Sequence, residues 1–324
     1  MSVGTAVDQV IEELRQADKL LLTTHENPDG DALGSLLGMH EVLGALGKDS
    51  VMFMAAEEFP LPREYRHLPL ESVIHLPPED LGERTIVFLD CGNIDRMPAA
   101  FLQHDEAHIL NIDHHHDNTC FGTVNLVDAE ASCTAQIVFE LAHEMGVELT
   151  HQIAVALYIG LVTDTGRFMY ENTSPRAHRM AADLLEQGVR PEEESRALYE
   201  GLPFARLKLL ERALQKTQRY DGGTLTLTHL TSEDFETAGA EESDSEGIVD
   251  HMRAVEGTKV AALVRERNPS GWKVSLRATD GLVDVSQIAR ALGGGGHRQA
   301  AGAKADLPLA DLIDQIRAGV AGQL

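Results

Sequence analysis

The chain has 324 residues and carries 27 Lys and Arg against 52 Asp and Glu, a formal net charge of −25. This charge argues against a protein that coats long nucleic acid, and the length allows two domains. The mean hydropathy of −0.17 is typical of a soluble globular protein, and no apolar run approaches the roughly 20 residues of a membrane span. The N-terminus lacks the pattern of a secretory signal, and Cys91, Cys120 and Cys133 lack metal-type spacing. We therefore expect a cytoplasmic protein with reduced thiols.

The first half of the chain alternates short apolar runs with amphipathic segments. Strands are predicted at residues 20–24, 50–54, 72–75, 85–90 and 108–113, and helices at residues 6–16, 32–46, 134–145 and 152–162. Short strands separated by helices predict an α/β domain over residues 1–190, built on a doubly wound, mostly parallel sheet. The apolar helix 152–162 could belong to the core or to the face of a homodimer, and we favour the core.

The pattern changes in the second half. Residues 174–218 look all-helical, with a proline near each helix start, and residues 191–222 are expected to form a helical connector. Strands are then predicted at residues 224–229, 259–265 and 272–278, and helices at residues 284–291 and 309–321. This pattern predicts a smaller α+β domain with a mixed sheet over residues 223–324. Residues 251–324 carry ten Lys and Arg against seven Asp and Glu, which suits a short anionic ligand.

The segment that follows the first predicted strand concentrates metal-type ligands. His25, Asp29 and Asp31 stand within seven residues, and Pro28 and Gly30 are expected to force a tight turn among them. A strand-turn-helix junction of this kind lies at the carboxyl end of a sheet, where open α/β folds bind ligands. Alone, Asp31 would be read as the N-cap of the next helix. The concentration of charge instead favours a positive ion.

Three further groups are predicted at the same edge of the sheet. Asp90 and the run Asp113-His114-His115-His116 each end a predicted strand, and Asp164 follows the apolar helix. Each alone has a commonplace explanation, because a strand-end Asp often caps a loop and a His pair is often solvated. Asp164, however, opposes the dipole of its helix. Together, with no Lys or Arg among them, these groups predict a metal cluster.

The ligand types indicate which ions the cluster binds. Carboxylates and imidazoles without thiolates suit Mn²⁺ or Mg²⁺, with Co²⁺ or Zn²⁺ as alternatives. Six or more ligands exceed what one catalytic ion with open positions uses, so we predict two ions that share a carboxylate. Such a pair holds a bridging hydroxide and clamps an anionic oxygen, which favours in-line hydrolysis of a phosphoester.

A glycine run near the C-terminus precedes His297 and Arg298. Consecutive glycines let backbone N–H groups approach an anion, although such a run can also be a flexible turn. On the neighbouring strands, the period of two puts Arg265 on one face with Arg267, and Ser275 with Arg277. If this face of the sheet is directed toward the glycine run, these residues form a phosphate site. Alternatively, the arginines are simply solvated charges on the surface of the sheet. The expected members of the phosphate site are Gly295, Gly296, His297, Arg298, Arg265 and Arg277.

These motifs resemble the DHH phosphoesterase superfamily. The resemblance rests on His25-x-Asn27-Pro28-Asp29-Gly30-Asp31, Asp90, Asp113-His114-His115 and Asp164, in this order along the chain. Residues 294–302 look like part of the DHH-associated C-terminal domain. The compact two-domain layout is most similar to NrnA-type oligoribonuclease/pAp phosphatases and to the stand-alone cyclic-di-AMP/pApA phosphodiesterases.

The resemblance implies a role for each matching residue. The ligands of one ion would be His25, Asp29 and Asp90, and those of the other would be Asp31, Asp90, His114 and Asp164, with Asp90 bridging. His115 would contact the substrate phosphate, as would Arg96, while Asp113 orients the histidines. The glycine-rich loop with His297 would hold the other end of the substrate. His116 lies outside the family pattern.

The resemblance and the acidic charge together imply an Mn²⁺-dependent hydrolase of short RNA oligonucleotides or pAp, with His115 and Asp90 catalytic. A phosphodiesterase for cyclic-di-AMP or pApA is the alternative enzyme, and a homodimer is compatible with either. An inorganic pyrophosphatase is disfavoured, because the glycine-rich loop with His297 suits a nucleotide. A non-catalytic nucleotide sensor is a hypothesis of a different functional class. The intact set of metal ligands disfavours it. Neither long-duplex binding nor membrane binding is expected.

Overall fold

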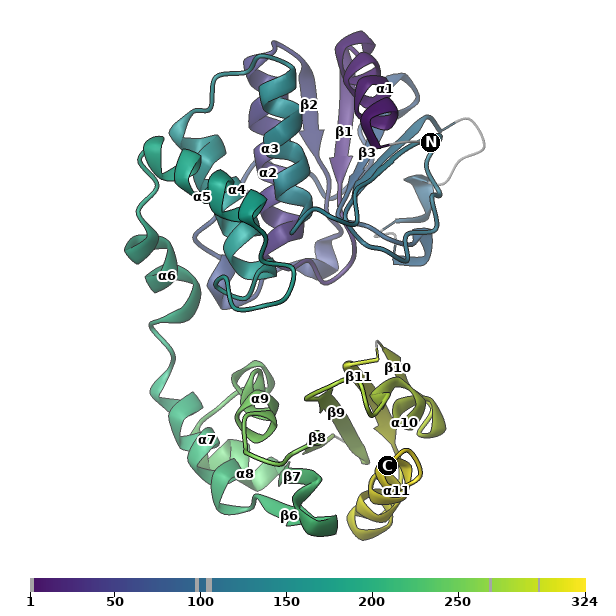
Figure 1. Cartoon of the computed structure of the whole chain (residues 1–324), viewed down its shortest axis with the longest axis vertical. Coiled ribbons are helices and arrows are strands. Elements are labelled where there is room, and N and C mark those ends of the chain that lie inside the picture. Colours follow the sequence, from purple (N-terminus) through teal and green to yellow (C-terminus); the bar gives the residue numbers. More distant parts are fainter. Residues whose placement is uncertain (1–2, 97–98, 103–106, 268–269, 297) are drawn as a thin grey trace. The chain divides into compact units, whose positions relative to one another are not determined.

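The computed structural model describes residues 3–96, 99–102, 107–267, 270–296 and 298–324. The chain forms two compact units, Met1–Glu200 and Gly201–Leu324. Each has its own sheet and its own hydrophobic core (Figure 1). In the ranges described, every helix is too short or too polar to span a membrane.

The first unit is built on a five-stranded sheet in which all neighbouring strands run parallel. The strand order is β2-β1-β3-β4-β5, which confirms the predicted parallel α/β sheet. Because the strands are parallel, their carboxyl ends meet at one edge. The strands are β1 (Lys19–Thr23), β2 (Asp49–Met52), β3 (Thr85–Leu89), β4 (Ile109–Asp113) and β5 (Val124–Val127).

Two expectations for this sheet are wrong. Residues 72–75 form no strand, and Ile74 makes only a single parallel bridge with Phe53. Pro77 and Pro78 follow closely and lack the amide donors that a longer ladder would need. The edge strand β5 was not predicted, because Asn125 interrupts its short apolar run and disfavours a strand.

The helices of the first unit pack mainly on one face of the sheet, together with the inward-facing residues of β1, β3 and β4. Loops and 3₁₀ turns cover the opposite face around Phe88. Helix α4 lies in the core, since nine of its fourteen residues are buried. The helices are α1 (Val3–Gln16), α2 (Gly30–Ala45), α3 (Thr134–Glu144), α4 (His151–Asp164), α5 (Pro175–Glu186) and α6 (Pro191–Tyr199).

The second unit contains a six-stranded sheet in the order β10-β11-β9-β8-β7-β6. Among the described strands, β7 and β8 pair in parallel and the other neighbours pair antiparallel, so the sheet is mixed, as predicted. The strands are β6 (Gln218–Tyr220), β7 (Leu225–Leu230), β8 (Val260–Glu266), β9 (Trp272–Ala278), β10 (Gly295–Gly296) and β11 (Ala300–Ala305). The helices are α7 (Phe204–Gln215), α8 (Ser232–Ala238), α9 (Ile248–Arg253), α10 (Val285–Ala291) and α11 (Leu309–Ala321).

The two faces of this second sheet differ in chemistry. Helices α10 and α11 cover one face, where Val264, Leu276 and Ala303 lie in the main core. Helices α7, α8 and α9 cover only part of the other face, around Ala261 and Leu263. The rest of that second face carries the charged residues of β8, β9 and β11.

Candidate metal centre and substrate face

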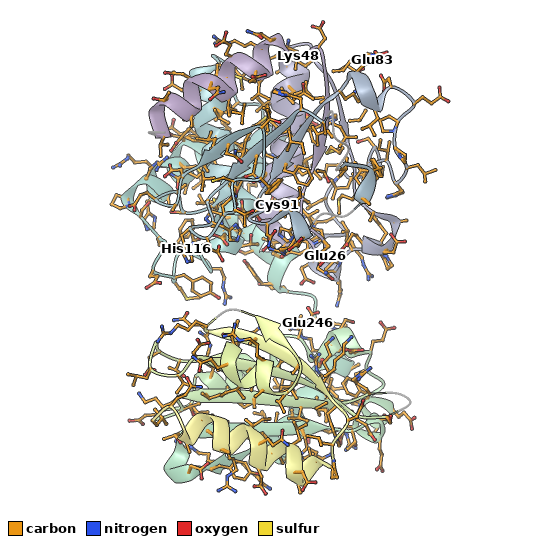
Figure 2. All side chains as sticks on the ribbon, turned by 90° about the vertical axis from the view of Figure 1, so that its right-hand side faces the viewer. Glu26, Lys48, Glu83, Cys91, His116 and Glu246 are labelled. Carbon is orange, nitrogen blue, oxygen red and sulfur yellow. The ribbon has the colours of Figure 1, made fainter. Side chains whose placement is uncertain are left out.

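The turn after β1 brings the first ligands to the carboxyl edge of the parallel sheet. His25 is buried, and Asn27 adopts the left-handed conformation with φ of 52°, so the turn is made there. Asp29 is the N-cap of α2, and its Oδ1 accepts from the amides of Asp31 (3.0 Å) and Ala32 (3.1 Å). The alternative explanation of Asp31 as the N-cap does not apply, since Asp31 lies in the first helical turn. Figure 2 marks this edge by Glu26, Cys91 and His116, each next to a ligand in sequence.

Gly30 has a different structural role from the expected one in a tight turn. It is the first residue of α2 rather than a turn residue with positive φ. A Cβ atom at Gly30 would collide with the side chain of Thr163 on α4. Glycine therefore lets α2 approach α4 closely, and this approach brings Asp31 near Asp164.

The Asp31 carboxylate is held by the start of helix α3. Oδ2 accepts from the amide of Thr134 (2.7 Å), and Oδ1 accepts from the amide of Ala135 (2.9 Å) and from Ser35 Oγ (3.2 Å). The positive end of a helix dipole favours a carboxylate in this position. Burial nevertheless raises the pKa of Asp31 well above its usual value, and repulsion from Asp90 and Asp164 raises it further.

Asp90 lies at the centre of the cluster. It follows β3 with a φ of 59°, an uncommon conformation for a non-glycine residue. Its carboxylate oxygens lie 3.6 Å from His25 Nε2, from His114 Nε2 and from His115 Nδ1. Burial acts to raise the pKa of Asp90, but its interactions with His25, His115 and His114 outweigh this effect. The pKa is thus well below the usual range.

His114 connects Asp90 to the ligands from α2 and α4. Its Nε2 lies 3.9 Å from Asp31 Oδ2 and 3.7 Å from Asp164 Oδ2. Asn172 donates to Asp164 Oδ2 at 3.0 Å and so fixes that carboxylate at the end of α4. Burial raises the pKa of Asp164 to about 6, with His114 opposing the shift and Asp90 adding to it.

His115 is held by a buried carboxylate behind it. Its Nδ1 lies 2.7 Å from Asp113 Oδ1, and Asn118 donates to the other oxygen of Asp113 at 2.5 Å. Burial acts to lower the pKa of His115, but the hydrogen bond with Asp113 and the nearby carboxylates raise it to about 9. The imidazole is then protonated near neutral pH, with Nε2 as a donor.

The predicted ligands are brought together in three overlapping groups. Within each group, one ligand atom per residue lies within 4.8 Å of the others. Two of the groups share Asp90 and two share His114. The groups are His25, Asp29 and Asp90; Asp90, His114 and His115; and Asp31, His114 and Asp164.

The chemistry of this donor set fits divalent cations. It consists of carboxylates and imidazoles, as hard divalent ions prefer. Asp31 and Asp90 are almost fully buried, at 1% and 2% exposure, and burying charge in this way is costly without a compensating cation. The side chain of Arg96 reaches the cluster: its Nη2 lies 2.7 Å from His25 Nδ1. The guanidinium thus contacts a predicted ligand directly.

The glycine run of the second unit forms a tight hairpin. Gly295 pairs with Gly302, and Gly296 pairs with Ala301 at a φ of 135° that requires glycine. Arg298 donates to the carbonyl of Gly281 at 2.7 Å. His297 lies outside the described residues.

The predicted strand arginines lie on the charged face of the sheet. The register pairs Arg277 with Ala300 and Arg265 with Lys273, which puts both arginines on the same face as Ser275. Arg265 is buried and donates to Ser275 Oγ at 2.9 Å. Arg277 donates to the carbonyl of Leu276.

Sequence reasoning missed the residues that hold the ligands in place. The most important is Thr134, whose Oγ1 donates to Asp90 Oδ1 at 3.0 Å while its amide donates to Asp31. Thr134 is the first residue of α3, and it was predicted as a helix start. The Ser and Thr residues at the start of that helix could have indicated hydrogen-bond donors. That this end of the helix is directed toward the metal ligands, however, depends on the tertiary structure.

Comparison with known proteins shows the family of this chain. Residues 19–161 match the model of the DHH family, N-terminal domain, and residues 228–322 match that of the DHHA1 domain. The chain is 40% identical over 285 residues to the bifunctional oligoribonuclease and PAP phosphatase NrnA of Thermus thermophilus, covering 88% of this chain and 83% of that relative. This chain belongs to the DHH family. The resemblance predicted from the sequence is confirmed.

One solved structure and one further curated protein are also similar to this DHH-family chain. A crystal structure of an exopolyphosphatase-related protein from Bacteroides fragilis superposes with a TM-score of 0.87 at 23% identity, covering 98% of this chain and 96% of that one, which shows the shared fold. The cyclic-di-AMP phosphodiesterase GdpP of Geobacillus thermodenitrificans is 25% identical over 336 residues, covering 95% of this chain and 48% of that relative.

Proposed function

We propose that this protein is an Mn²⁺-dependent phosphodiesterase and phosphatase that hydrolyses short oligoribonucleotides and pAp. Its class, a phosphoric ester hydrolase, accords with its membership of the DHH family. The observation that carries the proposal is the set of three ligand groups that share Asp90 and His114. The substrate is taken from the similarity to the Thermus NrnA.

The residues that would hold two ions are His25, Asp29, Asp31, Asp90, His114 and Asp164. When bound, such ions neutralise phosphoryl oxygens and lower the pKa of water toward neutrality. The protein would preorganise their ligands, because α3 donates hydrogen bonds to Asp31 and Asp90. Preorganisation of this kind avoids a reorganisation cost during the reaction.

His115 would act directly on the substrate phosphate. Asp113 occupies its Nδ1, so Nε2 is left to donate to a phosphoryl oxygen. With its pKa raised to about 9, the imidazole donates as a cation at neutral pH, and charge-assisted hydrogen bonds are roughly twice as strong as neutral ones. His115 Nε2 would therefore stabilise the negative charge that develops on the phosphoryl group.

The adjacent histidine offers a matched control. His116 is exposed and outside the ligand groups. We expect His115→Gln to lower kcat on pApA, pAp and pentaribonucleotides by about 10²–10³-fold, and His116→Gln to leave it unchanged. Equal rates for the two variants would contradict the role of His115.

The metal part of the proposal has its own test. We expect calorimetry to show Mn²⁺ binding to the wild-type protein and much weaker binding to Asp90→Asn, with loss of hydrolysis in that variant. Stoichiometric Mn²⁺ binding without hydrolysis of any of these substrates would favour the nucleotide sensor. Activity in Asp90→Asn equal to wild type would overturn the two-ion arrangement.

A cyclic dinucleotide phosphodiesterase is the second candidate, favoured by the similarity to GdpP across 95% of this chain. Hydrolysis of cyclic-di-AMP and pApA at equal concentrations separates the candidates. We expect pApA to be consumed faster. Faster consumption of cyclic-di-AMP would reverse the assignment.

A further inference from the structure

The loop that follows the predicted ligand Asp164 has an unusual backbone conformation. Gly166, Arg167 and Phe168 are three consecutive residues with positive φ, at 54°, 62° and 62°. Residues with side chains disfavour this region, and a bulky residue such as Phe rarely adopts it. Strain of this kind persists only where the surrounding structure fixes it, and it is concentrated at sites that bind ligands. The loop is therefore a candidate for part of a ligand site.

Two stacking contacts hold the strained residues in place. Arg167 Cζ lies 4.8 Å from the centre of the Tyr199 ring at the end of α6. Phe168 stacks on His178 of α5, with 5.1 Å between the ring centres. Both helices belong to unit Met1–Glu200, so these contacts are made within the unit that carries the metal ligands.

The chain then turns back toward Asp164. The amides of Met169 and Tyr170 both donate to the carbonyl of Thr165, the residue after Asp164, at 3.0 Å. Further along, Asn172 donates to the carboxylate of Asp164 at 3.0 Å and to its carbonyl at 3.1 Å. Tyr170 thus lies within a closed turn that begins and ends beside the predicted ligand.

The ring of Tyr170 lies across the α-carbon of Gly166. A Cβ atom at Gly166 would lie 2.4, 2.5 and 2.6 Å from three atoms of this ring, so only glycine allows the arrangement. Gly166 is two residues from Asp164, which limits the distance between their Cα atoms to about 7.6 Å. One face of the ring is therefore covered by the backbone of the turn, close to the ligand.

The opposite face of the Tyr170 ring is open to solvent. The residue is 54% exposed, although one side of its ring rests on the backbone. In the described part of the first unit, no other Phe, Tyr or Trp side chain is exposed to this extent. The protein thus presents a flat aromatic surface beside the predicted metal centre.

Two further tyrosines connect this ring to another predicted ligand. Burial raises the pKa of Tyr199, with Arg167 opposing the shift and Tyr170 adding to it. Burial also raises the pKa of Tyr65, and the charge of Asp29 and, more weakly, that of Tyr199 add to it. The three tyrosines are therefore successive neighbours that lead from the strained loop toward Asp29.

A ring of this kind suits a nucleobase. Every base has a face that can stack on an aromatic side chain, so such stacking tolerates any sequence. A ring that is already fixed on the backbone also loses little freedom when a ligand binds. A nucleotide held by its phosphate at the metal centre has its base only one sugar away.

We propose that Tyr170 stacks on the base of the nucleotide whose phosphate lies at the metal centre. The inference rests on the proposed function and adds to it a residue that determines specificity. Tyr170 favours nucleotides over phosphate esters that lack a base, and it does not select among the four bases.

Steady-state kinetics on pAp and on an analogue in which hydrogen replaces the adenine tests this role. We expect Tyr170→Ala to raise KM for pAp about 5–100-fold, the usual effect of removing one stacking partner, with kcat unchanged. KM for the base-free analogue should match wild type, and Tyr170→Trp should restore KM for pAp. Equal KM values of wild type and Tyr170→Ala on pAp would overturn the inference, as would equal increases on the two substrates.

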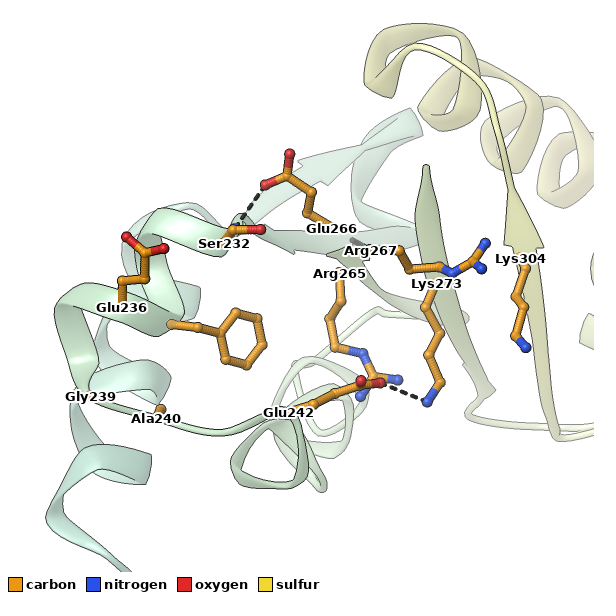
Figure 3. A pocket seen from close by; sticks show the side chains of 11 residues that line it. Ser232, Glu236, Gly239, Ala240, Glu242, Arg265, Glu266, Arg267, Lys273 and Lys304 are labelled. Carbon is orange, nitrogen blue, oxygen red and sulfur yellow. Dashed lines mark hydrogen bonds and ion pairs between the residues drawn. The ribbon is translucent and has the colours of Figure 1, made fainter. Parts of the chain in front are cut away.

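Lys273→Met is the control for the loss of a charge. Lys273 pairs with Glu242 at 2.8 Å on the charged face of the second sheet (Figure 3). A charge acts on a phosphate whether or not a base is present, so any effect of this substitution should be equal on pAp and on the base-free analogue. If Lys273→Met also affects pAp more than the analogue, discrimination does not belong to Tyr170 and the inference fails.

A fluorescent product analogue separates this inference from the proposed function. The fluorescence of 2-aminopurine ribonucleoside monophosphate is quenched when its base stacks on an aromatic ring, and no hydrolysis is involved. With Mg²⁺ in place of the paramagnetic Mn²⁺, we expect quenching by wild type and none by Tyr170→Ala. If wild type hydrolyses none of the substrates but this difference is found, the proposed function fails and the stacking is supported. If hydrolysis proceeds and both proteins quench equally, the proposed function is supported and the stacking is overturned.

Discussion

Replacing Gly34 by Ala tests the helix contact on which the metal centre depends. Gly34 lies on α2 where this helix crosses α4. A Cβ atom there would collide with the carbonyl oxygen of Ala156 and would lie 2.8 Å from the amide nitrogen of Gly160. Both obstacles are backbone atoms, so neither can rotate away, and the helices must separate.

The expected magnitude follows from two opposing effects. Overpacking a core costs about 1–3 kcal/mol, and a collision with backbone belongs at the upper end. Replacing a helical Gly by Ala returns about 1 kcal/mol of helix propensity. The net loss of about 2 kcal/mol corresponds to a fall in Tm of roughly 4–8 °C for a unit of this size.

Gly44→Ala on the same helix is the matched control. Nothing lies within 4 Å of a Cβ atom at Gly44 in the described part of the chain, so this variant should be as stable as wild type or slightly more stable. Calorimetric scans of the metal-free proteins measure both. Separation of α2 from α4 also moves Asp31 away from Asp164, so Gly34→Ala should bind Mn²⁺ more weakly. If Gly34→Ala and Gly44→Ala have the same Tm, the close contact between α2 and α4 is refuted.

Further predictions concern the residues around the ligands. Thr134→Val, which removes the hydrogen bond to Asp90, should weaken Mn²⁺ binding about 10–100-fold by calorimetry, and Thr134→Ser should restore it. In EDTA, stability should fall as the pH rises through about 6 and again toward 9. The folded protein holds protons on Asp164 and His115 more tightly than the unfolded chain does, so this stabilisation is lost on deprotonation; a flat Tm profile between pH 5 and 9 would contradict it. Asp113→Asn should lower the pKa of His115, so the alkaline limb of the pH–rate profile should move to lower pH; an unmoved limb would speak against the Asp113 contact.

Much of the metal centre could be predicted because its ligands stand at the ends of recognisable elements. Strands β1 and β3 contain continuous apolar runs, and β4 ends in Asp113 at the start of the Asp-His-His motif, so their carboxyl ends can be located from the sequence. Parallel strands then bring those ends to one edge without any knowledge of packing. The shared face of Ser275 and Arg277 on β9 follows from the local period of two, whereas the pairing of β8 with β9 is what adds Arg265 to that face.

The parts that escaped prediction depend on contacts between distant segments. Strand β11 consists mainly of Ala and Gly, residues with weak strand preference, and only its pairing with β9 explains it. The environment of Arg265 is equally invisible in the sequence: its Nε has no hydrogen-bond partner among the described residues, and this depends on the tertiary structure. The role of Gly30 was misjudged because its neighbour, Thr163, is remote in the chain.

The start of α3 supplies hydrogen-bond donors to two of the buried carboxylates in the cluster. Its first two amides satisfy both oxygens of Asp31, and its first hydroxyl satisfies one oxygen of Asp90. A buried carboxylate that lacked such donors would be far less stable. The donors do not cancel the charge, however, because the pKa of Asp31 and that of Asp164 remain raised. The fold therefore fixes the positions of the carboxylates and leaves their charge to a cation. Asn172, which donates to Asp164, extends this arrangement to α4.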